Sequence, residues 1–445
     1  MLLIVVDTLR TDHVGSLREH GGDAATPSPT PAIDRWASGA ARFRRARTPA
    51  SFTMPAVAGL MSGAYPDRCG VSAHEPGTTF SAWPGSTVAE SAREAGLATA
   101  AVIANPWLAR TGTGFDRGFD EFVRRYRRGQ AAGSSGAAAV TDEAIRILES
   151  AGGRRLLLWA HYFDPHMPYE PPAGFAHAAG APDSPSRVMS DFNDDARDLG
   201  RLYRGEGYSV AEIDHARRLY EGEVRYADHE IGRLLERLRT LGRENDTIVV
   251  IASDHGESLG EHGLYFAHDY TVYEELTRVP LLIRGPGVPA GMRDDHVSLL
   301  DVTPTLCRLA ALPCANRFDG RDLFASDRPA RTLFAAATPM RARGTAFDRL
   351  VVPGPAGRWT MALGERAKLI RIPTERGAEF ENYDLAADPR EVRNIGATAE
   401  SDALAAELAA WTVAMEEARP PSPRQPRSRK QRRDNRALRS LGYLQ

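Results

Sequence analysis

Short apolar runs, rich in valine, isoleucine and leucine, recur through the first two thirds of the chain. They do not alternate with polar residues, and this is typical of strands buried on both faces of a sheet. Longer segments between them carry apolar residues three and four positions apart, the spacing of one helix face. The runs that we assign to strands are Leu2 to Val6, Gly96 to Asn105, Leu156 to Ala160, Ile248 to Ala252 and Val279 to Ile283.

Helical segments alternate with these strands up to about residue 315. The alternation predicts a doubly wound α/β domain, with helices on both faces of one large sheet. Gly242 ends the longest helix, which leads directly into the strand at Ile248. The predicted helices are Ile33 to Ala37, a helix around Val57 to Met61, Val210 to Leu241 and Val302 to Leu312.

The helix around Val57 to Met61 follows a hydroxyl residue. Pro55 suits the first turn of a helix, and Gly63 ends this one. Thr53 therefore lies close to the helix N-terminus, where backbone N–H groups favour an anion. An ordinary N-cap explains a threonine at this place as well.

Other segments depart from the α/β pattern. Residues 127–140 are small and polar, which indicates an exposed connection. Between Pro171 and Tyr208 no period is clear, and such an insertion often shapes the mouth of a site. Beyond Arg331, short strand-like segments precede a helix from Asp402 to Glu417, which predicts a small antiparallel sheet with a helix. We expect a larger domain over residues 1–315, an α+β subdomain over 316–418 and a tail over 419–445.

The composition is that of a globular protein, with 445 residues, 42% of them hydrophobic and 26% charged. The formal net charge of −2 gives no general sign of a nucleic-acid partner, and we expect none. The tail alone carries eight arginines and one lysine against one aspartate, and we interpret it as a solvated extension. Its apolar residues Leu438, Leu441 and Tyr443 indicate as an alternative that its end packs on the body of the protein. Because the chain contains no apolar run of about eighteen residues, we expect no membrane span.

The chain begins directly with the strand from Leu2, without the pattern of a signal peptide, and we therefore expect a cytoplasmic location. Three cysteines occur, Cys69, Cys307 and Cys314, and their spacing fits no metal site. We predict that all three are reduced and that most of them are structural.

Polar side chains that can bind metals or transfer protons gather where the predicted strands end. Ligands bind outside the carboxyl ends of the strands of open parallel sheets, so carboxylates and imidazoles there can converge on a divalent metal. A hydroxyl beside such a metal is suited to attack an anionic ester. Seen alone, a capping aspartate in a turn explains one such strand end equally well. The residues are Asp7, Asn105, His161, Asp164, His166, Asp254 and His255, with Thr53 at its helix start.

Ordered motifs over nearly the whole chain resemble those of the sulfatase family within the alkaline phosphatase superfamily. This resemblance implies an alkaline-phosphatase-like doubly wound mixed sheet and makes the domain over residues 1–315 the catalytic one. The motifs are Asp7-Thr8-Leu9-Arg10, Thr53-Met54-Pro55 with Leu60 to Gly63, Asp164 to Tyr169, Ser253 to Glu257 with Gly260 to Gly263, Arg278 to Pro280 with Gly285 to Gly287, Asp301 to Leu306, Gly320 to Leu323, Lys368 to Ile370, Tyr383 to Pro389 and Leu441 to Leu444.

The resemblance also implies roles for single residues. Asp7, Asp254 and His255 match metal ligands, and Thr53 matches the nucleophile, whose oxygen also contacts the metal. His166 matches a histidine that contacts the substrate anion or the leaving group. His268 stands where many members have a lysine or histidine that contacts the sulfate or phosphate. Asn105 stands where the family often has a basic residue, and His161 is interpreted as a packed or supporting residue.

Three departures bear on the chemistry. Sulfatases proper oxidise a cysteine or serine to formylglycine, but Thr53 cannot form that aldehyde, because oxidation of a secondary alcohol gives a ketone. Val57 replaces the arginine that supports the hydrated aldehyde in the family. Thr8 replaces the second residue of the usual aspartate pair, so one carboxylate ligand is missing.

We therefore expect one divalent metal ion, Zn²⁺ or Mn²⁺ in preference to Ca²⁺, and no formylglycine. The predicted activity is hydrolysis or transfer of a sulfate, phosphate or phosphonate ester, with phosphoryl-type substrates slightly favoured. The substrate is an anionic ester of a small molecule, a glycan or a lipid headgroup. The alternative is a degenerate member that binds such an anion without turning it over.

Overall fold

Two β-sheets of different size organise the chain. The computed structural model describes residues 1–18, 27–72, 79–125, 136–194, 199–315, 317–338 and 357–420. The larger sheet has eight strands, and β9 runs antiparallel to both of its neighbours, whereas the other pairs are parallel. The order is β10 (Gly291–Ser298), β2 (Ala41–Arg47), β9 (Leu281–Arg284), β6 (Val249–Ser253), β1 (Leu2–Val6), β5 (Leu156–Tyr162), β3 (Ala98–Ile103) and β4 (Glu121–Arg124).

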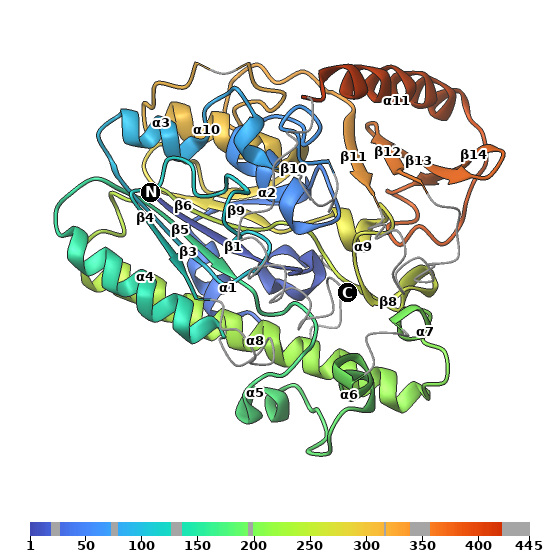
Figure 1. The fold of residues 1–445 in the computed structure, drawn as a ribbon, viewed down its shortest axis with the longest axis horizontal. Coiled ribbons are helices and arrows are strands. Elements are labelled where there is room, and N and C mark those ends of the chain that lie inside the picture. The colour runs from blue at the N-terminus through green and yellow to red at the C-terminus, as the bar shows by residue number, and fades with distance from the viewer. Residues whose placement is uncertain are drawn as a thin grey trace.

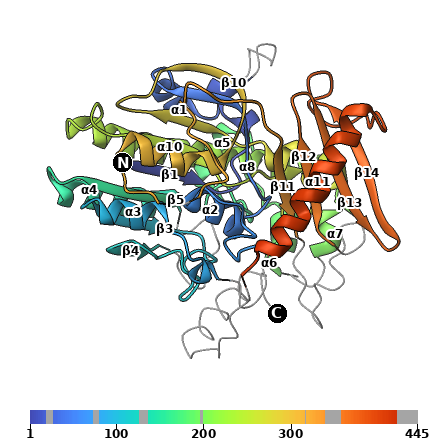
Figure 2. The same cartoon turned by 90° about the horizontal axis from the view of Figure 1, so that it is seen from above.

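Helices cover both faces of this sheet (Figures 1 and 2). Successive residues of β1 enter opposite cores, because side chains alternate across a strand. Leu2, Ile4 and Val6 pack with one layer of helices, and Leu3 and Val5 with the other. The predicted doubly wound mixed sheet is confirmed. The first layer contains α1 (Pro31–Ala37), α4 (Ala137–Ala151) and α8 (Val210–Thr240), and the second α2 (Thr53–Ser62), α3 (Val88–Glu94) and α10 (Val302–Leu309).

The smaller sheet lies beside the larger one, with α11 across it, at the right of Figure 1. Leu404, Leu408 and Trp411 of α11 (Ala399–Ala418) pack on one face, and the other face packs against Val272 and Tyr273. This confirms the predicted antiparallel sheet with a helix. Its strands are β11 (Leu333–Ala337), β12 (Trp359–Leu363), β13 (Ala367–Thr374) and β14 (Gly377–Asp384).

The predicted domain boundaries stay predictions, and the tail from residue 421 lies outside the described residues. The connection predicted over 127–140 is wrong at its end, because α4 begins at Ala137, and residues 126–135 are not described. In its described residues, the insertion from Pro171 to Tyr208 contains three short helices, which lie along α8 and β8 (Tyr265–Ala267). The strand β8 pairs with β7 (Ser258–Leu259). The three helices are α5 (Ala173–Ala178), α6 (Arg187–Asp194) and α7 (Leu199–Tyr203).

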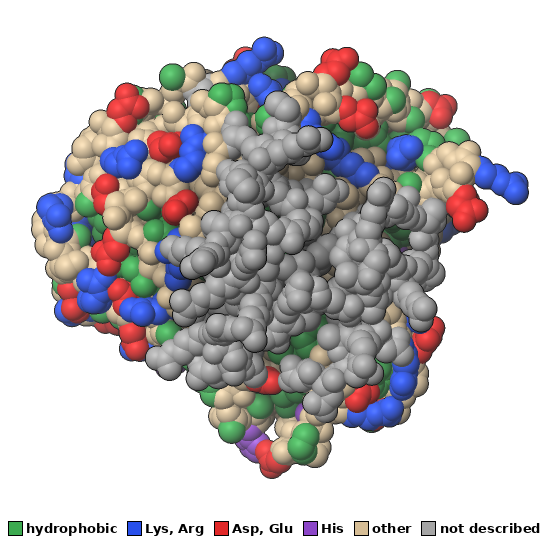
Figure 3. Space-filling view, viewed as in Figure 1, with side chains coloured by type: hydrophobic (Ala, Val, Ile, Leu, Met, Phe, Trp, Pro, Cys, Tyr) green, Lys and Arg blue, Asp and Glu red, His purple; other side chains and the backbone are tan. Residues whose placement is uncertain are grey.

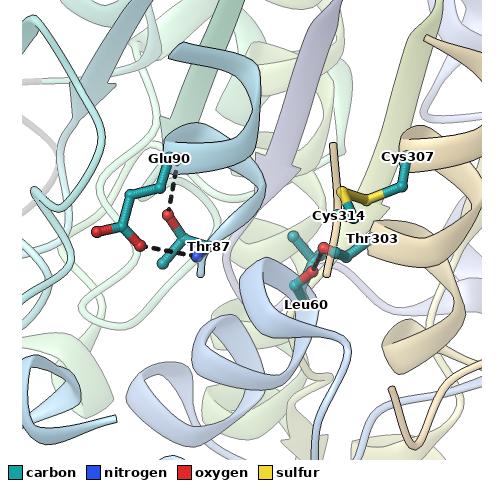
Figure 4. The surroundings of a disulfide bond; sticks show 6 residues. All are labelled: Leu60, Thr87, Glu90, Thr303, Cys307 and Cys314. Atoms are coloured by element: carbon teal, nitrogen blue, oxygen red, sulfur yellow. Dashed lines mark hydrogen bonds between the residues drawn. A yellow bond between two sulfur atoms is a disulfide. The ribbon is translucent and has the colours of Figure 1, made fainter. Parts of the chain in front are cut away.

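The prediction that all three cysteines are reduced is wrong for two of them. Cys307 and Cys314 form a disulfide (Figure 4), because the turn after α10 brings their Cα atoms to 6.0 Å. Beside it, the Thr303 hydroxyl donates to the Leu60 carbonyl at 2.6 Å and joins α10 to α2. Cys69 is free and buried, and burial raises the pKa of its thiol to about 12.

Over the described part of the surface around α3 and α4, acidic and basic side chains are interspersed (Figure 3). Among the described residues, no helix combines the length and the apolar character that a membrane span requires.

Candidate active site

Two neighbouring strands bring the predicted acidic residues together. In the parallel pair of β1 and β6, Val6 lies opposite Ser253. Asp7 and Asp254 directly follow these residues, so their side chains meet at the same edge of the sheet. With His255 they form a fully buried group whose potential ligand atoms all lie within 4.8 Å of one another.

The donor atoms of this group fit a divalent metal. Asp7 Oδ1 and Asp254 Oδ2 are buried and have no hydrogen-bond partner among the described residues. His255 Nε2 lies 3.5 Å from the first oxygen and 3.7 Å from the second. His255 Nδ1 lies 2.9 Å from the Gly256 carbonyl oxygen and must donate to it, so the lone pair of the neutral ring is on Nε2. Two carboxylate oxygens and an imidazole lone pair are suitable ligands for such an ion.

Thr53 lies beside this group at the first residue of α2. Its side chain is buried, and Oγ1 is 3.3 Å from His255 Nε2. The predicted place at a helix N-terminus is thus observed, and Gly63, with φ +69°, ends the helix as expected. The first turn of a helix leaves backbone N–H groups without intrahelical acceptors, and these favour a negative charge close to the hydroxyl.

Asn105 connects the nucleophile candidate to the acidic pair. Its Nδ2 donates to Asp7 Oδ2 at 2.6 Å and faces Thr53 Oγ1 at 3.4 Å. Its Oδ1 accepts from the backbone N–H of Trp107 and Leu108, which fixes the orientation of the amide. The sequence assigned no firm role to this residue, whereas the structure shows that it contacts both Asp7 and Thr53.

His268 lies between His255 and acidic residues that favour its charged form. Its ring centroid lies 4.5 Å from that of His255, and its Nδ1 is 3.0 Å from Glu257 Oε1. Burial lowers the pKa of His268, but Glu257 and Asp269 outweigh burial and raise it to about 10. Tyr169 donates its hydroxyl hydrogen to the other oxygen of Glu257 at 3.2 Å. Sequence reasoning missed Glu257, although it ends the motif that begins at Ser253.

His166 lies next to His268, with their ring centroids 4.8 Å apart. It stacks on Phe163 at 4.4 Å, and its Nδ1 donates to the Met167 carbonyl at 2.6 Å. Burial and the neighbouring His268 hold the pKa of His166 well below its usual value. The site therefore contains one neutral and one charged imidazole beside each other.

The structure separates the two remaining candidates. His161 is buried in β5, and its Nε2 lies 3.8 Å from Asp254 Oδ2, so it stands next to one carboxylate of the site. Asp164 interacts instead with Glu223, and burial raises its pKa to about 6. Asp164 is therefore outside the group of metal-binding candidates.

Comparisons with known proteins show the family and the fold of the chain. The family model described as Sulfatase matches residues 1–312. A choline-sulfatase of Rhizobium meliloti (strain 1021) is 38% identical over 109 residues, which are 24% of this chain and 21% of that protein. The match with that curated relative thus spans about a fifth of its length.

Solved structures share the fold over almost the whole chain. The structure of BT4656 in complex with its substrate D-glucosamine-2-N,6-O-disulfate has a TM-score of 0.70 and 20% identity, covering 96% of this chain and 99% of that one. The phosphonate monoester hydrolase SpPMH from Silicibacter pomeroyi has a TM-score of 0.68 and 21% identity, covering 94% of each chain. At these identities the likeness shows the fold alone.

Proposed function

The chain belongs to the sulfatase family, and from this premise we propose that it is a metal-dependent hydrolase or transferase of anionic esters with Thr53 as nucleophile. One observation carries the proposal: the Thr53 hydroxyl lies 3.3 Å from His255 Nε2, at a helix N-terminus and beside two carboxylate oxygens that lack partners among the described residues. A buried hydroxyl at such a place is suited to attack an anionic centre.

Phosphate or phosphonate esters are the favoured substrates. Formylglycine chemistry needs a cysteine or serine where this chain has Thr53. Val57, where the family has a supporting arginine, is fully buried in the apolar cluster beneath α2, so no guanidinium occupies its place. The fold is shared by sulfatases and phosphonate monoester hydrolases, so it is compatible with both ester classes. A threonine alcohol suits phosphoryl or phosphonyl transfer, which needs no aldehyde.

One divalent ion, Zn²⁺ or Mn²⁺ in preference to Ca²⁺, would be held by Asp7, Asp254 and His255 together with Thr53. Such an ion would lower the pKa of the Thr53 hydroxyl and offset the charge of the substrate. Asn105 keeps the oxygen of Thr53 and the carboxylate of Asp7 in fixed relative positions. Its second contact, to the backbone after β3, keeps this geometry independent of the substrate.

The two neighbouring imidazoles, His268 and His166, have different functions in this proposal. His268, whose pKa is about 10, carries a positive charge at neutral pH and attracts the oxygens of the ester. Its charge, held in place by Glu257, is directed at the site before the substrate arrives. His166 is neutral and contacts the substrate anion or the leaving group. The substrate is an anionic ester of a small molecule, a glycan or a lipid headgroup.

The test is a panel of aryl esters. We compare purified full-length protein with the variant Thr53→Ala and the matched control Thr53→Ser. The substrates are 4-nitrophenyl sulfate, 4-nitrophenyl phosphate, 4-nitrophenyl phenylphosphonate and bis(4-nitrophenyl) phosphate. Each protein is assayed after chelation and again after Zn²⁺, Mn²⁺ or Ca²⁺ is returned. We expect the phosphorus esters to be preferred, Thr53→Ala to lower kcat by about a thousandfold or more, and Thr53→Ser to keep measurable turnover. Binding of these anions without metal-dependent turnover of any ester would instead indicate the degenerate member.

A further inference from the structure

A cavity of about 470 Å³ lies between the larger sheet and the end of the smaller one. We call it the arginine cavity. Among the described residues that line it, none belongs to the proposed reaction site. Its lining consists of Arg44, Arg45, Arg47, Glu274, Arg278, His296, Glu365, Arg366, Leu385, Ala386 and Pro389.

Positive charge exceeds negative charge in this lining. Five arginines face two glutamates. Glu274 is neutralised twice, because Arg47 binds both of its oxygens at 3.1 and 2.6 Å and Lys368 Nζ lies 3.0 Å from Oε1. Arg45 is exposed and has no ion-pair partner among the described residues. Arg44 pairs with Asp294 at 2.9 Å, and Arg366 pairs with Asp384 at 2.8 Å. Arg45 therefore adds a positive charge that no carboxylate among the described residues balances.

Arg47 has a donor that no described residue uses. Only 3% of the residue is exposed, yet its Nη1 has no hydrogen-bond partner among the described residues. The buried Nε of Arg44 is in the same condition. Buried polar groups are almost always paired in folded proteins, so two such guanidinium donors on one cavity indicate a missing acceptor. Guanidinium groups match the oxygens of phosphate and sulfate in geometry and in charge.

The pKa of His296 is lowered by the same arginines. Burial and the neighbouring Arg47 and Arg45 lower the pKa of His296 to about 4, so the ring is neutral. Its Nε2 donates to the Glu365 carbonyl at 3.2 Å, which joins β10 to the turn before β13. The cavity thus spans both sheets, and an anion in it would contact residues of each.

We propose that the arginine cavity is a second anion site, separate from the reaction site, that binds a phosphate or sulfate group. It takes the group either as the free inorganic ion or as the ester group of a small sugar, because both present the same tetrahedral oxygens. The volume is within the range of pockets that hold small organic ligands, so a sugar ester fits it as well as the ion alone.

Titration calorimetry of the full-length protein with inorganic sulfate and phosphate tests this site. The variants are Arg45→Gln and Arg366→Gln, singly and together, because both side chains are exposed and their replacement leaves the pair of Arg47 and Glu274 intact. The matched control is Arg376→Gln, an exposed arginine in the turn between β13 and β14, outside the cavity. We expect the double variant to weaken anion binding at least about tenfold and the control to leave it unchanged.

Parallel titrations with glucose 6-phosphate identify the source of the group. Tighter binding than inorganic phosphate, lost in the double variant, assigns the site to a sugar ester, whereas equal or weaker binding assigns it to the free ion. Binding that is unchanged in the double variant, or lowered equally by Arg376→Gln, overturns the proposal, and so does the absence of any binding to the wild type. Melting temperatures of all variants verify that they are folded.

Discussion

Replacing Asp7 by asparagine tests the metal site, because the variant should be more stable than the wild type without metal and less stable with metal. The substitution removes one charge from a pair of buried carboxylates and keeps the size of the side chain. Asp7 and Asp254 are both fully buried, with ligand atoms within 4.8 Å of each other. Two unit charges at that separation repel by about 3 kcal/mol at an effective dielectric constant of about 20.

Without metal, we expect Asp7→Asn to be more stable than the wild type by up to about 3 kcal/mol near pH 8. Burial and Asp254 raise the pKa of Asp7. A carboxyl with a raised folded-state pKa costs stability as the pH rises from its unfolded pKa to the folded one. The wild type therefore becomes less stable with rising pH over that window, and the difference from the variant shrinks toward acidic pH.

With metal, the order reverses. A ligand at a thousand times its Kd stabilises the wild type by about 4.1 kcal/mol, which exceeds the advantage of the variant, and the variant, which lacks one ligand, gains little. Urea unfolding from pH 5 to pH 8, in chelator and then with Zn²⁺, Mn²⁺ or Ca²⁺, measures both effects. Asp164→Asn is the control, since this buried carboxyl interacts with Glu223 instead, and it must keep the metal-dependent gain. A full metal gain in Asp7→Asn, or no gain in the wild type, would refute the reasoning.

Three further predictions concern stability and covalent structure. Burial lowers the pKa of His262, but Glu275 raises it to about 9, so the charged ring stabilises the wild type by up to about 3 kcal/mol below pH 6.5, and this stabilisation disappears by about pH 9. The variant His262→Gln should lack it. Unfolding of both proteins at several pH values measures the difference. Lys368→Met should lower the free energy of unfolding by about 3 to 5 kcal/mol, because it leaves the carboxylate of Glu391 buried without its cation. The double variant with Glu391→Gln should recover part of this loss. Chemical unfolding measures both effects. Denatured, unreduced protein should expose one thiol to Ellman's reagent, that of Cys69, and three after reduction; three before reduction would contradict the disulfide.

The thiol count also bears on location. Disulfides persist in oxidising compartments, and they are rare in the cytosol of mesophiles. The cytoplasmic location expected from the sequence stays a prediction until that measurement is made.

The central strands and the acidic pair could be predicted because burial alone determines their pattern. The strand at Leu2 was predicted with its observed bounds, Asp7 follows its apolar run directly, and Asp254 follows the run that ends at Ala252 after one serine. By contrast, β2 was missed, because four of its seven residues are arginine. Partners far along the chain, such as Glu274 for Arg47, compensate these charges, and no local pattern reveals such partners.

The supporting residues of the site were harder to predict for a similar reason. Asn105 is 98 residues from Asp7 in sequence, and its role follows only from the contact that the fold creates. His268 was predicted from the family resemblance alone. Its charge depends on Glu257, which packs against it from the loop after β6. The residues that act directly stand in motifs, whereas those that position them depend on tertiary contacts.

Trapping the reaction on Thr53 tests the central claim most directly. The metal-loaded protein is mixed with its preferred aryl ester, quenched with acid during turnover, and mapped by peptide mass spectrometry. The account predicts that the peptide containing Thr53 gains the mass of one transferred phosphoryl, phosphonyl or sulfuryl group, and that Thr53→Ala gains none. Turnover without any adduct on this peptide, together with undiminished activity in Thr53→Ala, would contradict it.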